Sequence, residues 1–202
     1  MTAAILANKR LLATLQLMAD AGIESAADGL SQMIGRRVIM TVPKVTTLPF
    51  CEVPARVGGA EVPVVGIYLA CNGDLGGHIM LILQQEEALR LVDLLLDQPE
   101  GVAVEFDPLA RSALAEAGNL AVSFFLNAIA TVMGISSRPS PPAVIVDMAG
   151  AILDIMLVVA GEFGDEVLLL ETMFRDADRH IKLLFWMLPD LLPLQDLVWG
   201  RG

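Results

Sequence analysis

The stretch VVGIYLACNGDLGGHIMLIL, residues 64–83, predicts a β-hairpin and with it the class of the fold. Two apolar runs flank the turn Gly73-Asp74-Leu75-Gly76, whose glycines supply the positive φ that a tight turn requires. The segment ILDIMLVVAGEFGDEVLLLE, residues 152–171, has the same pattern around Gly161-Glu162-Phe163-Gly164. Because strands that return through hairpins are antiparallel, we expect an α+β fold with an antiparallel sheet.

A second correspondence extends the repeat upstream. VPKV (residues 42–45) matches PPAV (residues 141–144), and each opens an extended segment at the same distance after a helix. The order helix, strand, hairpin, helix therefore occurs twice, which predicts a duplication. We expect one pseudo-twofold domain over residues 1–202, with halves of about 1–100 and 101–202 that meet between Glu100 and Asp107.

Hydrophobic period and turn residues predict the other elements. The strongest signal is Asp107-Pro108, because Asp is a preferred helix N-cap and Pro a preferred first residue; this helix runs to Gly134. The remaining expectations are a helix over 5–35 with a break near Gly22, a strand over 38–45, a loop over 46–63, an amphipathic helix over 86–96 and a closing helix over 176–188.

Composition and charge restrict the partners. The 202 residues carry 13 Lys and Arg against 24 Asp and Glu, a net charge of −11, so nucleic-acid phosphates and anionic membrane surfaces would be repelled. The two cysteines, Cys51 and Cys71, are too few for a disulfide framework. We therefore expect a protein of the reducing cytoplasm.

Two apolar runs raise the question of a membrane span. Residues 117–137 carry no charge and are long enough to cross a bilayer. They contain Asn119 and Asn127, which would need partners in hydrocarbon, so a helix buried in a soluble core is the better interpretation. Residues 143–161 are interrupted by Asp147 and Asp154, and we expect strand there.

Three polar residues on the long helix form the candidate site. Ser112, Glu116 and Asn119 are spaced i, i+4, i+7, so they fall within an arc of roughly 60° and can meet one ligand. Their neighbours are mostly Ala and Gly, which would let another surface approach closely.

These residues resemble a known signature. Glu116-x-x-Asn119, followed by Pro142, is similar to the Glu-x-x-Asn…Pro motif of the CheC/CheX/FliY family of chemotaxis phosphatases, and Ser112 occupies the position four before the Glu. The segments AADGLSQMIGRRVIMTVPKV, DMAGAIL and LPDLLPL also resemble the family, which extends the likeness over nearly the whole chain. The branch that the chain resembles most is CheC.

The resemblance implies a fold and a reaction. The fold is pseudo-twofold α+β, an antiparallel sheet with two long motif-bearing helices. The reaction is hydrolysis of the aspartyl phosphate of a CheY-like response regulator, for which Asn119 holds the water and Glu116 binds a cation on the partner, such as its active-site lysine. Mg²⁺ would belong to the regulator, so no cofactor or metal site is expected on this chain. The deamidase CheD is a possible second partner.

The corresponding positions in the first half differ. Counting back from Pro43 by the same distances gives Leu17 in place of the Glu and Asp20 in place of the Asn. Leucine cannot bind a cation, and aspartate lacks the donor of a carboxamide. One active site, in the second half, is therefore expected.

Two other functions are compatible with these residues. The first is a non-catalytic binding module, because the middle domain of the flagellar switch protein FliM has a similar fold without the Glu-x-x-Asn pair. The second is an enzyme with another substrate on the same scaffold, which is the weaker alternative because no nucleophile and base stand together in the sequence.

Overall fold

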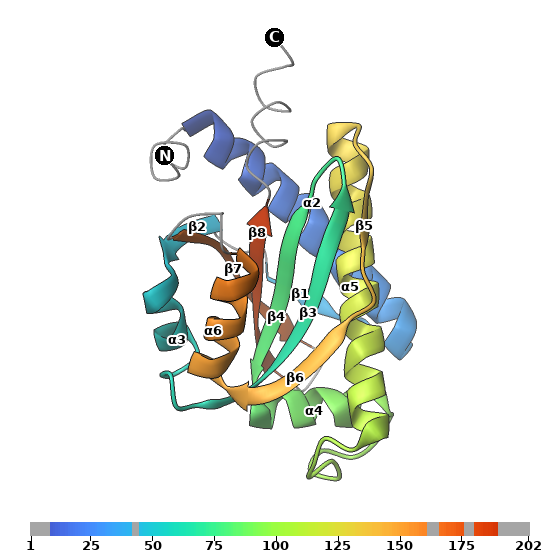
Figure 1. Cartoon of the computed structure of the whole chain (residues 1–202). Helices are drawn as coiled ribbons and strands as arrows, with labels where there is room; N and C mark the ends of the chain where they lie inside the picture. Colours follow the sequence, from blue (N-terminus) through green and yellow to red (C-terminus); the bar gives the residue numbers. More distant parts are fainter. Residues whose placement is uncertain (1–8, 42–44, 161–165, 176–179, 190–202) are drawn as a thin grey trace.

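An antiparallel sheet lies between two layers of helices in the computed structural model of the chain (Figure 1). The structure describes residues 9–41, 45–160, 166–175 and 180–189. Its elements are α2 (Lys9–Ile34), β1 (Ile39–Met40), β2 (Val45–Pro49), a 3₁₀ turn η1 (Phe50–Glu52), α3 (Val53–Arg56), β3 (Pro63–Gly73), β4 (Gly77–Gln84), α4 (Gln85–Leu95), α5 (Pro108–Met133), β5 (Ser137–Pro139), β6 (Ala143–Met148), α6 (Ala149–Ala160), β7 (Glu166–Arg175) and β8 (His180–Pro189). The α+β class is confirmed.

The two predicted halves contribute interleaved strands to this sheet. The strand order is β1-β7-β8-β4-β3-β5, and β2 also pairs with β7 while β6 pairs with β3. The two hairpins, β3–β4 and β7–β8, meet in the middle through β4 and β8. Strands of the first half therefore pair with strands of the second: β1 and β2 lie beside β7, and β5 and β6 lie beside β3. The superposition of the halves stays a prediction.

The predicted second hairpin is wrong in its position. Residues 152–160 belong to helix α6, and the hairpin is formed instead by β7 and β8, so the expected helix over 176–188 is also wrong from His180 on. Its predicted turn, residues 161–164, lies outside the described residues. Both errors have one cause: a continuous apolar run has no period that separates a buried strand from a buried helix. For the same reason the strand expected over 143–161 ends at Met148.

The first half agrees better with its prediction. β3 and β4 form the expected hairpin, with positive φ at Gly73 and at Gly77 in place of the expected Gly76, and α4 lies where it was predicted. In the second half, α5 also lies where it was predicted. Of the strand expected over 38–45, residues 39–40 and 45 are strand and residues 38 and 41 are not, while residues 42–44 lie outside the described part. Residues 46–63 are not all loop, since they include most of β2 and the short helix α3.

The sheet is buried on both faces because its strands alternate between two apolar clusters. On one face, side chains of the sheet pack against α2, α4 and α5; on the other, they pack against α3 and α6. In β8, for example, Phe185 and Met187 belong to the first cluster while Leu184, Trp186 and Leu188 belong to the second. This alternation follows from the period of two along a strand.

Helix α2 is continuous through Gly22, so the expected break there is wrong. The glycine serves packing instead: a Cβ on Gly22 would overlap the ring of Phe125 on α5, and one on Gly29 would overlap the ring of Phe124. Two phenylalanines of α5 thus lie over glycines of α2. This contact holds the two 26-residue helices together on the sheet.

We expect Gly22→Ala to lower the free energy of unfolding, because overpacking costs about 1–3 kcal/mol and outweighs the roughly 1 kcal/mol by which Ala favours a helix over Gly. Urea denaturation followed by circular dichroism measures the change. Gln32→Ala, at an exposed position of the same helix, is the control and should leave stability nearly unchanged. A Gly22→Ala variant as stable as the wild type would contradict the packing role.

Candidate functional site

Helix α5 carries the candidate site, and its N-terminus is anchored by a side-chain cap. Asp107 Oδ1 accepts the backbone N–H of Ala110 at 2.7 Å, and Pro108 occupies the first turn, as predicted. Arg111 then ties this turn to its surroundings: Nε donates to the carbonyl of Phe106 at 3.0 Å and Nη1 to the carbonyl of Val144 at 3.3 Å. The start of α5 is thereby joined to strand β6.

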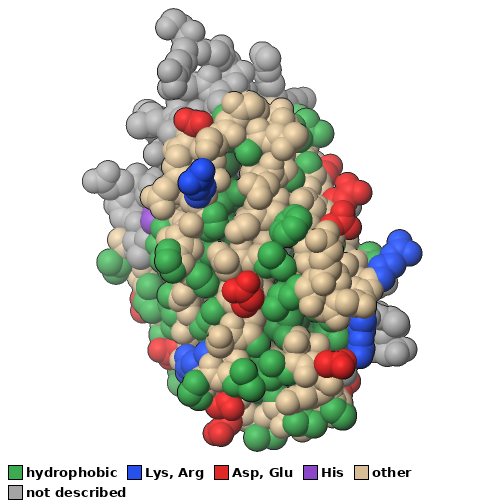
Figure 2. All heavy atoms as spheres, turned by 90° about the vertical axis from the view of Figure 1, so that its right-hand side faces the viewer, with side chains coloured by type: hydrophobic (Ala, Val, Ile, Leu, Met, Phe, Trp, Pro, Cys, Tyr) green, Lys and Arg blue, Asp and Glu red, His purple; other side chains and the backbone are tan. Residues whose placement is uncertain are grey.

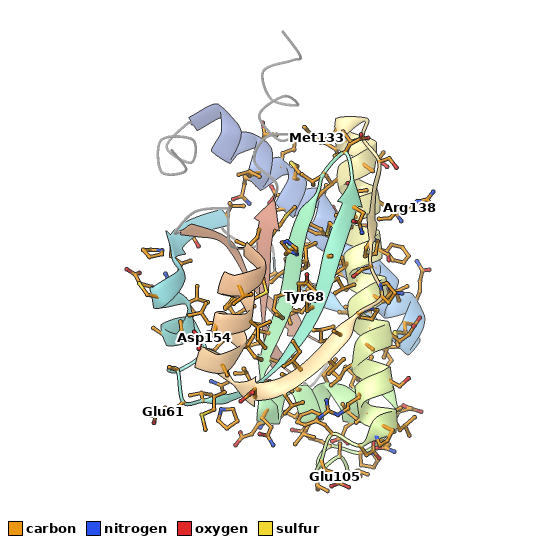
Figure 3. All side chains as sticks on the ribbon, in the orientation of Figure 1. Glu61, Tyr68, Glu105, Met133, Arg138 and Asp154 are labelled. Carbon is orange, nitrogen blue, oxygen red and sulfur yellow. The ribbon has the colours of Figure 1, made fainter. Side chains whose placement is uncertain are left out.

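The C-terminus of α5 is held by the tip of the β3–β4 hairpin. After Gly134, which is left-handed with φ 67°, the backbone carbonyl and N–H of Ser136 bond the N–H and carboxylate of Asp74 at 2.7 and 2.9 Å. The hydroxyl of Ser137 accepts from the N–H of Leu75 at 3.0 Å and donates to its carbonyl at 2.9 Å. The turn residues that identified the hairpin therefore also fix the end of the site helix. Figure 3 places Met133, near this end, at the opposite end of the molecule from Glu105.

The predicted site residues lie together on the outer face of α5. Ser112 and Glu116 are exposed and Asn119 is half-buried. Opposite them, Gly118 rests on the sheet so closely that a Cβ would lie 2.6 Å from Cγ2 of Ile67. Among the described residues, none bonds or ion-pairs with any of these three polar side chains. The carboxylate and the carboxamide are therefore available to an external partner.

The counterpart in α2 has a different character. Leu17 is 56% exposed, and Asp20 is half-buried and accepts a hydrogen bond from Nε2 of Gln16 at 2.6 Å. Oε1 of Gln16 in turn accepts from the N–H of Val45 at 3.0 Å. This helix presents an apolar side chain and an already bonded carboxylate where α5 presents a free acid and a free amide.

Pro142, the third residue of the motif, lies in the link between β5 and β6 and is half-buried. It does not belong to α5. Pro142 stands directly before β6, where proline is suitable because it has no backbone N–H to donate to a neighbouring strand.

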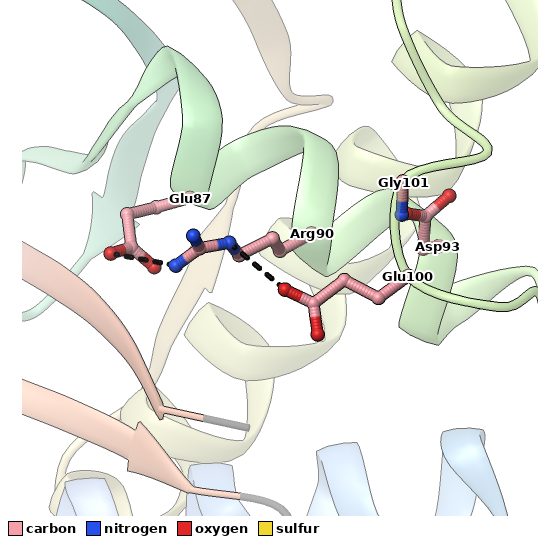
Figure 4. Close-up of polar contacts among 5 residues, drawn as sticks. All are labelled: Glu87, Arg90, Asp93, Glu100 and Gly101. Carbon is pink, nitrogen blue, oxygen red and sulfur yellow. Dashed lines mark hydrogen bonds and ion pairs between the residues drawn. The ribbon is translucent and has the colours of Figure 1, made fainter. Parts of the chain in front are cut away.

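Sequence reasoning missed the carboxylate that organises the loop before α5. Asp93 of α4 is buried, and one of its oxygens accepts the N–H of Gly101 at 2.7 Å (Figure 4). Its other oxygen accepts the N–H of Ala103, also at 2.7 Å. The signal was available in the sequence, since an acid inside the apolar run VDLLL needs a buried partner. The segment 100–107, predicted as the boundary between the halves, is thus joined to α4 by these two hydrogen bonds.

A separate titratable group lies on the central hairpin. Tyr68 Oη and His78 Nδ1 are 2.8 Å apart and the two rings stack. Burial lowers the pKa of His78 and raises the pKa of Tyr68, with the nearby Cys71 adding to the second shift; burial also raises the pKa of the Cys71 thiol to about 12. At neutral pH the thiol is protonated, so Cys71 offers no thiolate nucleophile.

The described residues contain no group of three or more His, Cys, Asp or Glu side chains that could hold a metal ion. Helix α5 is long and apolar enough to cross a bilayer, but nine of its residues are buried within the fold, against α2 and the sheet among others. Packing in the core accounts for its composition.

Comparisons with known proteins extend over nearly the whole chain. No family model matches it. It is 30% identical to the CheY-P phosphatase CheC of Bacillus subtilis over 192 residues, which cover 93% of this chain and 92% of that protein.

Solved structures share the fold. FliY of Thermotoga maritima matches with a TM-score of 0.77 at 19% identity, covering 96% of this chain and 98% of that one. The FliM middle domain from H. pylori matches with a TM-score of 0.67 at 11% identity, covering 95% and 98%. A chain of the CheX-CheY-BeF3-Mg complex from Borrelia burgdorferi matches with a TM-score of 0.51 at 16% identity, covering 84% and 95%.

The lowered pKa of His78 predicts a loss of stability in mild acid. An unfolded histidine takes up its proton near the ordinary pKa of 6.5, whereas the folded protein takes it up only at lower pH. The unfolded state therefore binds more protons as pH falls below about 6.5, and the free energy of unfolding decreases. We expect His78→Gln to remove this component, so that the urea midpoint drops less between pH 7.5 and 5.5 than in the wild type. Equal drops in both proteins would contradict the role of His78.

Proposed function

Because the chain belongs to the CheC/CheX/FliY family, we propose that it hydrolyses the aspartyl phosphate of a CheY-like response regulator. The observation that carries the proposal is the pair Glu116 and Asn119, which lies on the outer face of α5 without an internal partner among the described residues. The name of the B. subtilis relative, a CheY-P phosphatase, supports the substrate, and the CheX-CheY complex supports direct docking between two such proteins. These chemotaxis relatives also support the expected cytoplasmic location.

Asn119 is the residue that we assign to the attacking water. Hydrolysis of an acyl phosphate requires a water oxygen in line with the phosphorus; a new P–O bond forms, the bond to the aspartyl oxygen breaks, and phosphate and a free carboxylate result. A carboxamide accepts a hydrogen bond from the water and donates another, so it can orient that water. Because Asn119 stands on a helix anchored at both ends, the backbone that carries its carboxamide is held in place before the partner binds.

Glu116 is the residue that we assign to docking. It precedes Asn119 by three residues and is exposed, so both side chains can enter one partner site. Its carboxylate would pair with a cation there, and the lysine that accompanies the aspartyl phosphate in receiver domains is the suitable group. Charge-assisted hydrogen bonds of this kind define geometry as well as affinity.

The Mg²⁺ of the reaction is assigned to the regulator. It would neutralise the phosphoryl oxygens while this chain supplies the amide and the carboxylate. No step of the proposal requires a cofactor on this chain.

The alternative is a non-catalytic binding module, which the likeness to the FliM middle domain favours at the level of fold alone. A module of that kind would bind a regulator and leave its phosphoryl half-life unchanged. The turnover assay below separates the two functions. A CheD partner stays a prediction.

We expect the wild-type protein to accelerate decay of a phosphorylated CheY-like receiver domain, and Asn119→Ala to reduce that acceleration about 10²-fold or more because the water loses its orienting group. Phosphate release from acetyl-phosphate-labelled receiver measures the rate. Urea denaturation is the control, since removal of an unbonded, partly exposed side chain should change stability by less than about 0.5 kcal/mol. A wild type that leaves the half-life unchanged across the receivers of the same cell would refute the proposal.

Only the second half should be active. A carboxylate at Asp20 adds negative charge against an already anionic phosphoryl site, and Leu17 offers no partner for a lysine. We therefore expect Glu116→Ala with Asn119→Ala to leave no hydrolysis above the regulator's own rate, while Leu17→Ala with Asp20→Ala retains nearly all of it. A first double variant that kept about half of the turnover would assign activity to α2 as well.

A further inference from the structure

Three exposed apolar side chains gather where α4 leads into α5. Val102 and Val104 of the connecting loop are 51% and 77% exposed, and Leu109 in the first turn of α5 is 58% exposed. All three line one hollow of about 210 Å³, which is also lined by Val92 of α4 and by Leu96, the residue that follows this helix. We call Val102, Val104 and Leu109 the loop patch. In the view of Figure 2, hydrophobic side chains lie among acidic ones at this lower end of the molecule.

The loop patch is held in place although it is exposed. Asp93 accepts the N–H groups of Gly101 and Ala103, which flank Val102. Arg90 adds a second tie, with its Nε 3.2 Å from Glu100 and its Nη1 3.8 Å from Glu87 (Figure 4). The buried carboxylate of Asp93 and the ion pair between Arg90 and Glu100 thus hold the loop in one conformation, although its apolar side chains are exposed to water. Such order lowers the entropic cost of binding a partner.

The loop patch adjoins the pair Glu116 and Asn119. Leu109 precedes Glu116 by seven residues, which is two helical turns, so the two side chains share one stripe of α5 about 10.5 Å apart. A standard protein interface covers about 800 Å² on each partner, a disc of roughly 16 Å radius. A domain centred on Glu116 and Asn119 would therefore also cover Leu109 and reach the hollow beside it.

We propose that the loop patch is the apolar part of the surface on which the phosphorylated receiver domain docks; this inference rests on the proposed function. The receiver places its phosphoryl site against Glu116 and Asn119, and an apolar side chain beside that site enters the hollow at Val104. The position of the patch two helical turns from Glu116 favours this partner, and the charged rim disfavours a second copy of the chain. Glu105 and Asp107 are exposed next to the patch, so self-association would bring like charges together in a protein of net charge −11.

The test measures binding separately from turnover. The binding probe is a receiver domain activated with BeF₃⁻ and Mg²⁺, titrated calorimetrically into the protein, and the turnover probe is the same receiver labelled with acetyl phosphate. We expect Val104→Glu to raise Kd and KM about tenfold, as for a buried contact at an interface, with kcat unchanged. Val104→Ser should weaken binding in the same direction, which removes introduced charge as the cause.

Val158→Glu is the matched control. Val158 is 83% exposed on α6, which packs on the opposite face of the sheet from α5, so the same substitution there should leave Kd and KM unchanged.

Asp93→Asn tests whether the order of the loop contributes to binding. An amide has one acceptor oxygen instead of two, so amide hydrogen exchange at Gly101 or Ala103 should accelerate. Kd should rise while kcat is retained.

The outcomes separate the two proposals. Unchanged Kd in both Val104 variants, or an equal loss in Val158→Glu, would overturn the role of the loop patch while leaving the phosphatase intact. Sedimentation showing a wild-type dimer that Val104→Glu dissociates would assign the patch to a second copy and also overturn it. Patch-dependent binding without any turnover would uphold the patch and reject the phosphatase. Binding is also measured for Asn119→Ala, which should still bind the receiver.

Discussion

Burial of both faces of the central sheet is the constraint on which the rest of the structure depends. The inner strands β3, β4 and β8 carry apolar side chains on alternate faces, so neither face can remain in water. Two helical layers are then required: α2, α4 and α5 cover one face, and α3 and α6 cover the other (Figure 1). Because β2 pairs with β7 and β6 with β3, the sheet is complete only when both halves of the chain are present.

This constraint also makes α5 suitable for an exposed site. Its inner side is pressed against Ile67 through Gly118, its start is capped by Asp107, and its end is held by the hairpin tip at Asp74. A helix fixed at three places turns its remaining face outward in a defined orientation. Positioning of a water molecule is the kind of catalysis that benefits from such rigidity, because small displacements of the orienting group reduce the rate strongly.

The helices α2 and α5 have equal length and pack on each other, yet their outer faces differ in chemistry. Packing requires only that Gly22 and Gly29 leave room for Phe125 and Phe124, and it places no demand on the outer positions. Leu17 and the Gln16-bonded Asp20 on α2 are therefore as compatible with the fold as Glu116 and Asn119 on α5. The contacts between the two helices lie away from these outer positions, so the outer faces can differ in chemistry while the packing is kept.

The sequence by itself determined the features that depend on a few neighbouring residues. Glycines in the 73–77 turn require positive φ, Asp107-Pro108 caps a helix, and the spacing of Glu116 and Asn119 places both on one face; each follows from local backbone geometry. Only the tertiary structure decided the features that depend on distant contacts. The apolar run of α6 continues onto its exposed side at Ile155 and Val158, and that of β8 is buried on both faces, so neither run has a period that distinguishes helix from strand. The contacts that each run makes in the folded chain settle its form. The sequence predicts a break at Gly22, whereas the structure shows that this glycine leaves room for the ring of Phe125, more than a hundred residues away in the chain. Asp93 and the loop that it orders belong to the same class, since the two N–H groups that it binds come together only in the folded chain.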